Sequence, residues 1–254
     1  MGYSVIIPSR NVANLSVCVR QIREMGETCR VIVVDDGLTC DWQTYFRLIG
    51  DVEVAKGMEP FVFARAVNQG IRASGTDDVV ICNDDALLRT SKGFSILRDQ
   101  IARTQLFNYP YGAICPSFTH GSVGTLNLVN RGRSGLAEEH TMLVFACVYI
   151  PRSTIDRVGL LDERFGVNAG GPGARGYGLE DDDYSLRIRQ SGLKLGVYDG
   201  VLVDHLPEST GLKSTFRHDP EHPHDVTIHE RLFAEKHGHW PEGHGFAPGK
   251  SRMK

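Results

Sequence analysis

The stretch Val79–Asp85 constrains the fold of this chain more than any other. Its first four residues, VVIC, form an apolar run of strand length, and Asn83, Asp84 and Asp85 follow directly. A strand that is covered on both faces has such a continuous apolar pattern. Open α/β sheets bind ligands at the carboxyl ends of their strands, and two adjacent carboxylates favour a hard cation such as Mg²⁺ or Mn²⁺. A strand that ends in an ordinary polar turn is the alternative interpretation.

The first third of the chain alternates between strand and helix patterns. A strand at Val5–Ile7 is followed by apolar residues at helical spacing over residues 15–25, for which Asn14 is the expected N-cap. The second buried strand, Val31–Val34, also ends in two acids, Asp35-Asp36. A strand, a helix and a strand within some thirty residues predict a right-handed βαβ unit.

The pattern continues and then changes. Pro60 is expected to open a second helix that ends before Gly75, and Ser91 is expected to cap a third. We expect a long loop over residues 118–139 and a strand or hairpin over residues 195–203 that turns at Asp199-Gly200. The sequence therefore predicts an α/β domain in which the acid-bearing loops converge at one edge of the sheet.

Composition limits the class of protein. The 254 residues include 28 basic and 31 acidic ones, a balance that neither predicts nor excludes a nucleic-acid partner. The six cysteines are scattered, and we expect Cys82 and Cys147 to be buried free thiols in a reducing cytoplasm. No signal peptide and no membrane span is expected, so the protein should be soluble and cytoplasmic. We expect one domain over residues 1–210 and a His-rich extension over residues 211–254, packed on it or partly mobile; the oligomeric state stays open.

Seven motifs carry a resemblance to a known family. In chain order they are VIIPSRN from Val5, VIVVDDG from Val31, FARAVNQGI from Phe63, VVICNDDALL from Val79, GLLDERF from Gly159, GLEDDDYSLRIRQSG from Gly178 and VDH ending at His205. The chain resembles the nucleotide-sugar-dependent glycosyltransferases of family 2 over roughly residues 3–210. The resemblance implies the GT-A fold, a Rossmann-like mixed and mainly parallel sheet flanked by helices.

The resemblance also implies a cation site for Mn²⁺ or Mg²⁺. It makes Asp85 a metal ligand, gives Asp84 a contact with the ribose or sugar of the donor, and puts Asn83 where many members have an acid. Because the sequence is NDD and not a strict DxD, the division of roles between Asp84 and Asp85 stays open. His205 would complete the metal site, and a surface or capping histidine is the alternative.

The nucleotide side of the donor pocket follows the first two strands. The resemblance implies that residues at these strand ends hold the base and the ribose. Asn68 lies in the helix that packs under the nucleotide, and tying down a neighbouring loop is an equal alternative for it. The expected donor-binding residues outside the NDD motif are Pro8, Ser9, Arg10, Asp35, Asp36 and Asn68.

The acceptor side is expected around the second acidic run. The resemblance makes Asp181 the general base that takes a proton from the acceptor hydroxyl, with Gly178 and Glu180 on the acceptor side. Neighbouring acids should raise the proton affinity of Asp181. Alternatively, some of these acids only cap a helix, because carboxylates favour helix N-termini.

These features predict a metal-dependent, inverting glycosyltransferase. It would move a hexosyl or pentosyl group from a nucleotide-diphosphate sugar, such as a UDP-sugar, to a hydroxyl of a glycan or other cell-surface precursor. One alternative is a soluble phage-type enzyme that modifies hydroxymethylated bases in DNA, and another is a non-catalytic sugar-nucleotide-binding module. A nucleotidyltransferase should carry a Gly-rich, Arg/Lys-bearing signature after the first strand, and PSRNVANLS does not provide one.

Overall fold

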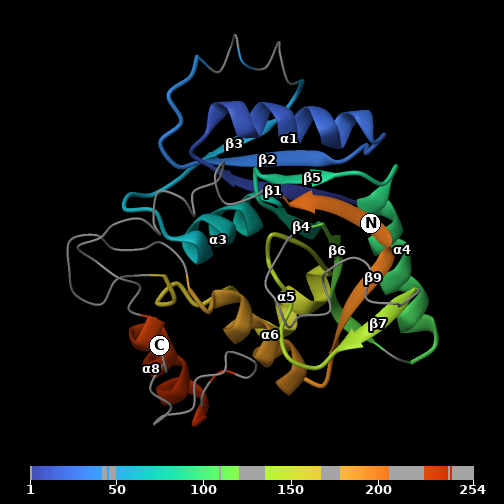
Figure 1. Ribbon diagram of the computed structural model, residues 1–254, viewed down its shortest axis with the longest axis vertical. Coiled ribbons are helices and arrows are strands. Elements are labelled where there is room, and N and C mark those ends of the chain that lie inside the picture. The colour runs from blue at the N-terminus through green and yellow to red at the C-terminus, as the bar shows by residue number, and fades with distance from the viewer. Residues whose placement is uncertain are drawn as a thin grey trace, which may run out of the picture.

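The structure is a computed structural model that describes residues 2–41, 45, 50–108, 110–119, 135–166, 178–205, 226–239 and 241. A central sheet lies between layers of helices (Figure 1). The strands are β1 Tyr3–Ser9, β2 Arg30–Asp35, β3 Glu53–Lys56, β4 Asp78–Cys82, β5 Ala86–Leu88, β6 Tyr111–Phe118, β7 Leu136–Glu139, β8 Cys147–Ile150 and β9 Lys194–His205. The helices are α1 Val12–Glu24, α3 Phe63–Ala73, α4 Gly93–Leu106, α5 Arg152–Val158, α6 Glu180–Gln190 and α8 Val226–His237.

The nine strands form one mixed sheet in the order β3-β2-β1-β4-β8-β6-β9-β5, with β7 beside β9. The half made of β3, β2, β1 and β4 is parallel. Strand β8 runs antiparallel to both β4 and β6, and β9 is parallel to β6 but antiparallel to β5 and β7. The parallel half therefore brings the carboxyl ends of β1, β2 and β4 to one edge.

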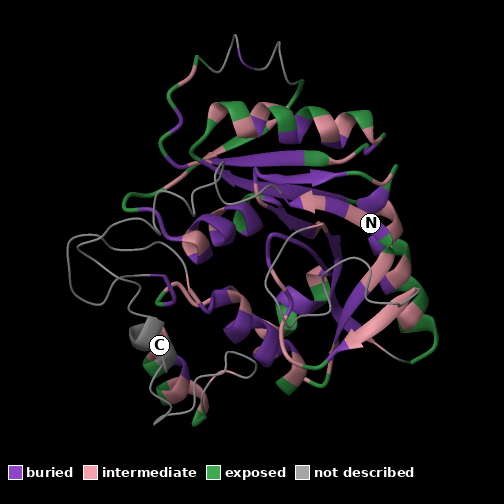
Figure 2. Cartoon of the chain, viewed as in Figure 1, coloured by how far each residue is buried: buried purple, intermediate pink, exposed green. Residues whose placement is uncertain are grey.

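Alternate residues of the strands face two different helix layers. In β1, Val5 and Ile7 pack with α1 and α4, whereas Ile6 packs with α3, α5 and α6. All three side chains are fully buried, each worth roughly 1.5–3 kcal/mol of hydrophobic free energy. Figure 2 shows the buried sheet between the two layers. The predicted α/β sheet flanked by helices is confirmed.

Gly70 sets the distance between α3 and the sheet. A Cβ atom at this position would lie 2.2 Å from Cγ2 of Ile6 in β1. Any side chain here would push the helix away from the strand. The glycine in the FARAVNQGI motif is therefore a close-packing residue.

Several local predictions differ from the structure. Helix α1 begins a turn earlier than expected because Asn11, not Asn14, is its N-cap: Oδ1 of Asn11 accepts the backbone N–H groups of Ala13 and Asn14 at 2.9 and 3.1 Å. Ser91 is not the cap of α4, since that position is Lys92, in a left-handed conformation. Helix α5 and the short strands β5 and β7 were not predicted.

The predicted turn at Asp199-Gly200 is wrong. Residues 194–205 form the single strand β9, which pairs with β6 on both sides of Asp199-Gly200. The register shifts between Pro116 and Ser117 of β6, where their partners in β9 are Tyr198 and Leu202. The extra residues of β9 are accommodated in this irregularity, so a turn-forming dipeptide lies inside a strand.

Candidate active site

The carboxyl end of β1 is where the first acidic residue is anchored. Ser9, the last residue of β1, is fully buried and donates a hydrogen bond from its hydroxyl to Oδ2 of Asp84 at 2.6 Å. The β1–β4 ladder ends at Ile6, so Pro8 interrupts no pairing with β4. The first strand thus holds the loop Asn83–Asp85 that follows β4, which we call the acid loop.

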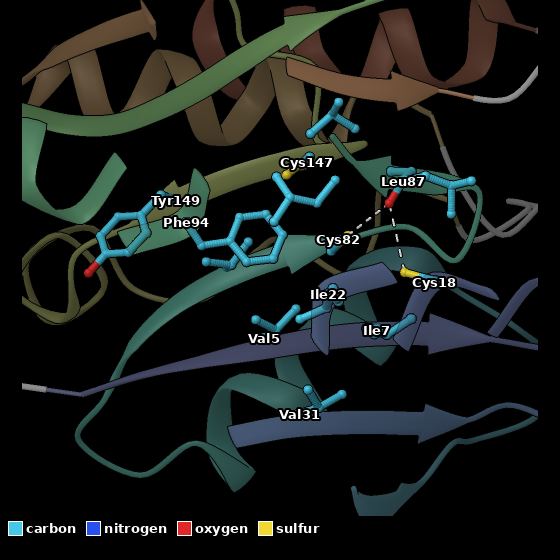
Figure 3. Close-up of a cluster of buried hydrophobic side chains, with 14 of the residues drawn as sticks. Val5, Ile7, Cys18, Ile22, Val31, Cys82, Leu87, Phe94, Cys147 and Tyr149 are labelled. Carbon is cyan, nitrogen blue, oxygen red and sulfur yellow. Dashed lines mark hydrogen bonds between the residues drawn. The ribbon is translucent and has the colours of Figure 1, made fainter. Parts of the chain in front are cut away.

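The acid loop keeps its shape through its own backbone and the thiols beneath it. The N–H of Ala86 donates to the carbonyl of Asn83 at 3.0 Å, which closes a turn around Asp84 and Asp85. The buried thiols of Cys18 and Cys82 donate to the carbonyl of Ala86 (Figure 3). Asn83 is half-buried, and its N–H donates to the carbonyl of Ala146 at 2.8 Å.

Cys82 and Cys147 form a cross-strand pair between β4 and β8. Both are buried and free, as predicted. They belong to the apolar cluster that packs α1 and α4 on the sheet, immediately below the acid loop. Of the two, Cys82 supports the turn directly, because its thiol donates to the carbonyl of Ala86.

Asp85 and His205 face each other although they are far apart in the sequence. The antiparallel pairing of β5 with β9 places Ala86 opposite His205. Nε2 of His205 then lies 3.6 Å from Oδ1 of Asp85, beyond hydrogen-bond distance, and both side chains are almost completely buried. Among the described residues, Oδ1 of Asp85 has no hydrogen-bond partner.

This pair fits a divalent cation. A buried carboxylate oxygen without a hydrogen bond is costly, and a carboxylate and an imidazole are both ligands for Mn²⁺. Within the described part of the chain, no group of three or more His, Cys, Asp or Glu residues is arranged to hold a metal. Asp85 and His205 would supply two ligands, with other positions open to a diphosphate and water.

A second group of charges surrounds Asp36, just beyond β2. Its N–H donates to the carbonyl of Ser9 at 3.1 Å, which fixes it beside the end of β1. Nε of Arg10 lies 3.4 Å from Oδ2 of the buried Asp36 carboxylate, and the Arg10 guanidinium also lies 3.6 Å from Glu59. The ring of Phe61 is 5.9 Å from the guanidinium carbon of Arg10. Asp36, Arg10 and Phe61 together offer a carboxylate, a cation and an apolar ring.

The sequence analysis did not identify Glu59 and Phe61 as neighbours of this site. They lie on both sides of Pro60, in the segment that returns from β3 to α3. Only the fold brings this segment against Arg10. The proline was a signal of a constrained loop but carried no information about which strand end it would contact.

Burial raises the pKa of both acids at this edge. The pKa of Asp84 rises to about 6, mainly through lost hydration, and the hydrogen bond from Ser9 opposes the rise. The pKa of Asp36 also rises to about 6 through burial, with Arg10 acting in the opposite direction. Ionising either carboxyl group therefore costs free energy in the folded protein. A bound cation or a hydrogen-bond donor of a ligand would offset this cost.

The raised pKa of Asp36 predicts a pH dependence of stability. In the unfolded chain an aspartate has a pKa of about 3.9, so between about pH 4 and 6 the folded protein binds more protons at this position. The free energy of unfolding should therefore fall as the pH rises through this range. We expect Asp36→Asn, which cannot ionise, to gain stability relative to the parent as the pH rises, in urea titrations with EDTA. Asp156→Asn, at a 61 % exposed side chain, is the control and should show no such trend.

The hydrogen bond from Ser9 predicts a second stability effect. Ser9→Ala leaves the buried Asp84 carboxylate without this donor, and we expect a loss of about 1–3 kcal/mol in the free energy of unfolding. Ser4→Ala is the matched control, because Ser4 lies in the same strand and donates at 2.7 Å to Asp77, which is more exposed. Equal losses for the two variants in urea unfolding would contradict a special role for Ser9.

Asn68 and Asp35, two of the expected donor-binding residues, form hydrogen bonds with backbone groups. The amide of Asn68 donates to the carbonyl of Leu161 at 2.9 Å and accepts from the N–H of Leu161 at 3.0 Å, which is the loop-tying role left open above. Oδ1 of Asp35 accepts from the N–H groups of Gly37 and Leu38. Donor contacts of Asn68, Asp35, Pro8 and the other residues stay predictions.

The second acidic run forms the first turn of α6. Leu179, the N-cap, adopts a left-handed backbone with φ 62°. The N–H of Gly178 donates to the Glu180 carboxylate, and Oδ1 of Asp181 accepts from the N–H of Asp182 at 3.0 Å. Glu180 is buried, whereas Asp181 keeps part of its surface exposed.

The surroundings of Asp181 raise its affinity for a proton. Lost hydration raises its pKa well above the usual range, and the charges of Asp182 and Glu180 raise it further. Asp183 differs: it is fully buried and paired with Arg187 at 2.9 Å one turn later. The four acids therefore divide into a group around Asp181 and one structural ion pair.

Comparisons with known proteins agree with this architecture. The family model described as Glycosyl transferase family 2 matches residues 4–97, which include β1, β2, β4 and the acid loop. The predicted resemblance to this family is confirmed. The comparison with curated proteins found no match.

Solved structures share the fold at low sequence identity. A mannosyltransferase from Pyrobaculum calidifontis in complex with GDP-Man and Mn²⁺ matches with a TM-score of 0.61 and 17% identity, over 82% of this chain and 58% of that one. GalNAc-T7 with UDP, GalNAc and Mn²⁺ matches with a TM-score of 0.59 and 13% identity, over 81% of this chain and 43% of that one. This chain thus spans less than two thirds of either protein. A UTP-bound UGPase from Acinetobacter baumannii matches with a TM-score of 0.52 and 13% identity, over 92% of this chain and 99% of that one.

These likenesses show the GT-A fold. The UGPase match shows that the likeness in fold is not confined to glycosyltransferases. Among the described residues, no helix is both long enough and apolar enough to cross a membrane.

Proposed function

We propose that this chain, whose residues 4–97 match the family model described as Glycosyl transferase family 2, transfers a sugar from a nucleotide-diphosphate sugar to an acceptor hydroxyl in a reaction that needs a divalent cation. The observation that supports it is the buried Oδ1 of Asp85, which makes no hydrogen bond with any described residue and faces Nε2 of His205 at 3.6 Å. The Mn²⁺ in both glycosyltransferase structures supports the choice of cation.

Asp85 and His205 would hold the cation, which supplies Lewis-acid stabilisation of charge on the leaving diphosphate. Ser9 donates a hydrogen bond to one carboxylate oxygen of Asp84. This bond fixes the carboxylate beside the pair and so sets the direction of its other oxygen. Asp36 and Arg10 offer an acceptor and a cation to the nucleoside and its phosphates. These residues bind and orient the donor.

The acceptor hydroxyl requires a base. Asp181 would take its proton, and the raised pKa of Asp181 makes the carboxylate a stronger base than a hydrated one. Attack by the hydroxyl oxygen on the anomeric carbon, opposite the departing diphosphate, is a single displacement that inverts the configuration. The proton moves to Asp181 and the nucleoside diphosphate leaves with the electron pair of the broken bond.

A panel of nucleotide sugars with Mn²⁺ tests the proposal. We expect one donor to raise the midpoint of thermal unfolding only when the cation is present, and we expect that donor to release nucleoside diphosphate in the presence of hydroxylated acceptors, glycans and hydroxymethylated DNA among them. Donor binding without any release, across all acceptors, would favour the sugar-nucleotide-binding module. Absence of cation-dependent binding would contradict the proposal.

A further inference from the structure

The C-terminal helix α8 packs against the segment that carries Asp181. Phe233 of α8 is 2% exposed and lies in an apolar cluster with Phe165, Leu179 and Leu186. Its ring meets that of Phe165 edge-on, with centroids 6.4 Å apart. Two of these neighbours, Leu179 and Leu186, belong to the N-cap and the second turn of α6.

The contact with Leu179 falls on a strained residue. Leu179 has a left-handed backbone, which L-residues with a side chain rarely adopt, and it immediately precedes Glu180 and Asp181. Such a conformation persists only where the surroundings hold it. The burial of the Leu179 side chain against Phe233 is one interaction that does so.

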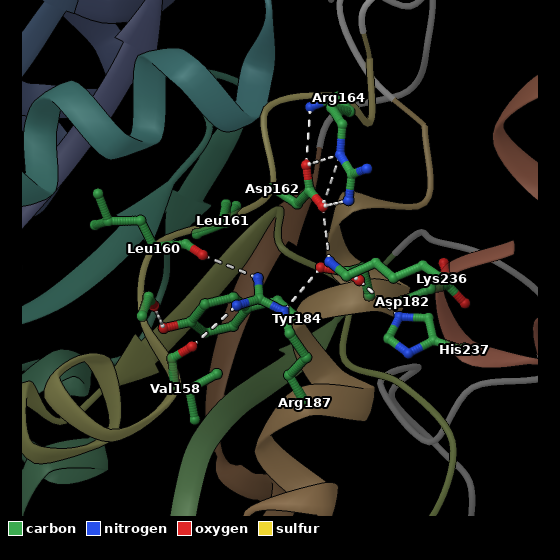
Figure 4. Close-up of polar contacts among 12 residues, drawn as sticks. Val158, Leu160, Leu161, Asp162, Arg164, Asp182, Tyr184, Arg187, Lys236 and His237 are labelled. Atoms are coloured by element: carbon green, nitrogen blue, oxygen red, sulfur yellow. Dashed lines mark hydrogen bonds and ion pairs between the residues drawn. The ribbon is translucent and has the colours of Figure 1, made fainter. Parts of the chain in front are cut away.

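Polar contacts join the last turn of α8 to Asp183 of α6 and to Asp162, which lies between α5 and α6. Nζ of Lys236 lies 2.8 Å from Oδ2 of Asp162 and 2.6 Å from Oδ1 of Asp183. Nε2 of His237 lies 2.7 Å from the same Asp183 oxygen. Figure 4 shows Lys236 and His237 reaching from α8 toward the acids, with Arg187 on the opposite side. Because Asp183 is fully buried, its ion pair with Lys236 is screened little by solvent.

A third contact involves Gly178. The N–H of Gly166 donates to Nε2 of His229 at 3.2 Å, and a Cβ atom at Gly178 would lie 2.6 Å from Nδ1 of the same ring. Gly178 also has φ 154°, a value that L side chains rarely adopt. The imidazole of His229 therefore occupies space that only a glycine leaves open, two residues before Glu180.

We propose that α8 is a positioning element of the active site, in which Phe233, Lys236 and His229 hold the strained entrance to α6 so that Asp181 points to the acceptor. The inference rests on the proposed function of Asp181. It assigns a role to the part of the chain that the family resemblance does not cover.

The test combines Phe233→Ala with two comparison variants. Phe233→Leu restores apolar volume, and Ile101→Ala removes a buried side chain from α4, which packs on the other face of the sheet. For each we would measure hydrogen exchange of the amides of residues 179–186, the affinity for nucleoside diphosphate with Mn²⁺, and kcat as a function of pH.

We expect Phe233→Ala to speed hydrogen exchange in residues 179–186 and to lower kcat by about 10- to 100-fold, with unchanged affinity for the nucleoside diphosphate. The acid limb of its kcat profile should move to lower pH, because a loosened turn lets water reach Asp181 and reduces the main cause of its raised pKa. Phe233→Leu should recover most of kcat, and Ile101→Ala should keep the parent's kcat and pH profile.

Two outcomes would overturn the inference. Parental exchange in residues 179–186 would show that α8 does not hold the turn, whether or not the chain is an enzyme. Faster exchange with the parent's kcat and pH profile would show that the contact is only structural. If the parent itself turns over no donor, the proposed function fails, and the exchange data still decide whether α8 holds the turn.

Discussion

Asp85→Asn is expected to abolish the Mn²⁺-dependent binding of nucleoside diphosphate and to lower turnover by at least about 100-fold. The substitution keeps the shape of the side chain but replaces a charged ligand oxygen by a neutral amide. In the parent, Oδ1 of Asp85 faces Nε2 of His205 at 3.6 Å. A cation held by this pair would therefore lose half of its protein ligands in the variant. Calorimetry with nucleoside diphosphate, with and without Mn²⁺, measures the effect.

Asp99→Asn is the matched control for Asp85→Asn. It removes the same charge from a side chain that is 61% exposed and paired with its neighbour Arg98. We expect its calorimetric titration to superimpose on the parent's. If Asp85→Asn bound the nucleotide with Mn²⁺ as tightly as the parent does, the cation site would have to lie elsewhere.

The parallel half of the fold was predictable because its signals are local. Val5–Ile7, Val31–Val34 and Val79–Cys82 are continuous apolar runs, and each lies within a strand of the structure. Strand β5, with three residues, is too short to show any periodicity. Asp199-Gly200 carries a turn signal, but the two residues lie in the irregular part of β9 between Tyr198 and Leu202, and pairing with β6 resumes after them.

The candidate site was predictable only as a set of residue types at strand ends. That Ser9 bonds Asp84, and that His205 faces Asp85, depends on the register of strands far apart in the sequence. The pairing of Ala86 with His205 across β5 and β9 is one of these long-range contacts. No local pattern in VDH or NDD encodes it, so the sequence alone left the role of His205 open.

The match to the UGPase leaves the proposed chemistry unchanged, because a TM-score of 0.52 at 13% identity shows a shared fold alone. After its first strand this chain has Pro8, Ser9 and Arg10. Ser9 is bonded to Asp84 and Arg10 lies beside Asp36, so the loop contributes one cation and no glycine-rich cradle for a triphosphate.

Asp181→Asn is expected to lower turnover by about 10²–10⁴-fold while the affinity for nucleoside diphosphate with Mn²⁺ stays at the parent's value. The asparagine side chain cannot accept the proton of the acceptor hydroxyl. Asp181 belongs to the first turn of α6 and not to the strand ends that carry Asp85 and Asp36, so donor binding should not depend on it. Steady-state kinetics and calorimetry on the same preparation separate the two effects.

Asp182→Asn distinguishes the base from its neighbours. The charge of Asp182 is one of the causes that raise the pKa of Asp181, so its removal should move the acid limb of the kcat profile to lower pH and leave the plateau near the parent's. Asp181→Asn should instead lose turnover at every pH, because no base is left to titrate. If Asp182→Asn lost the plateau and Asp181→Asn kept it, the base would be Asp182 and the alternative role of Asp181, a carboxylate that stabilises the helix N-terminus, would hold.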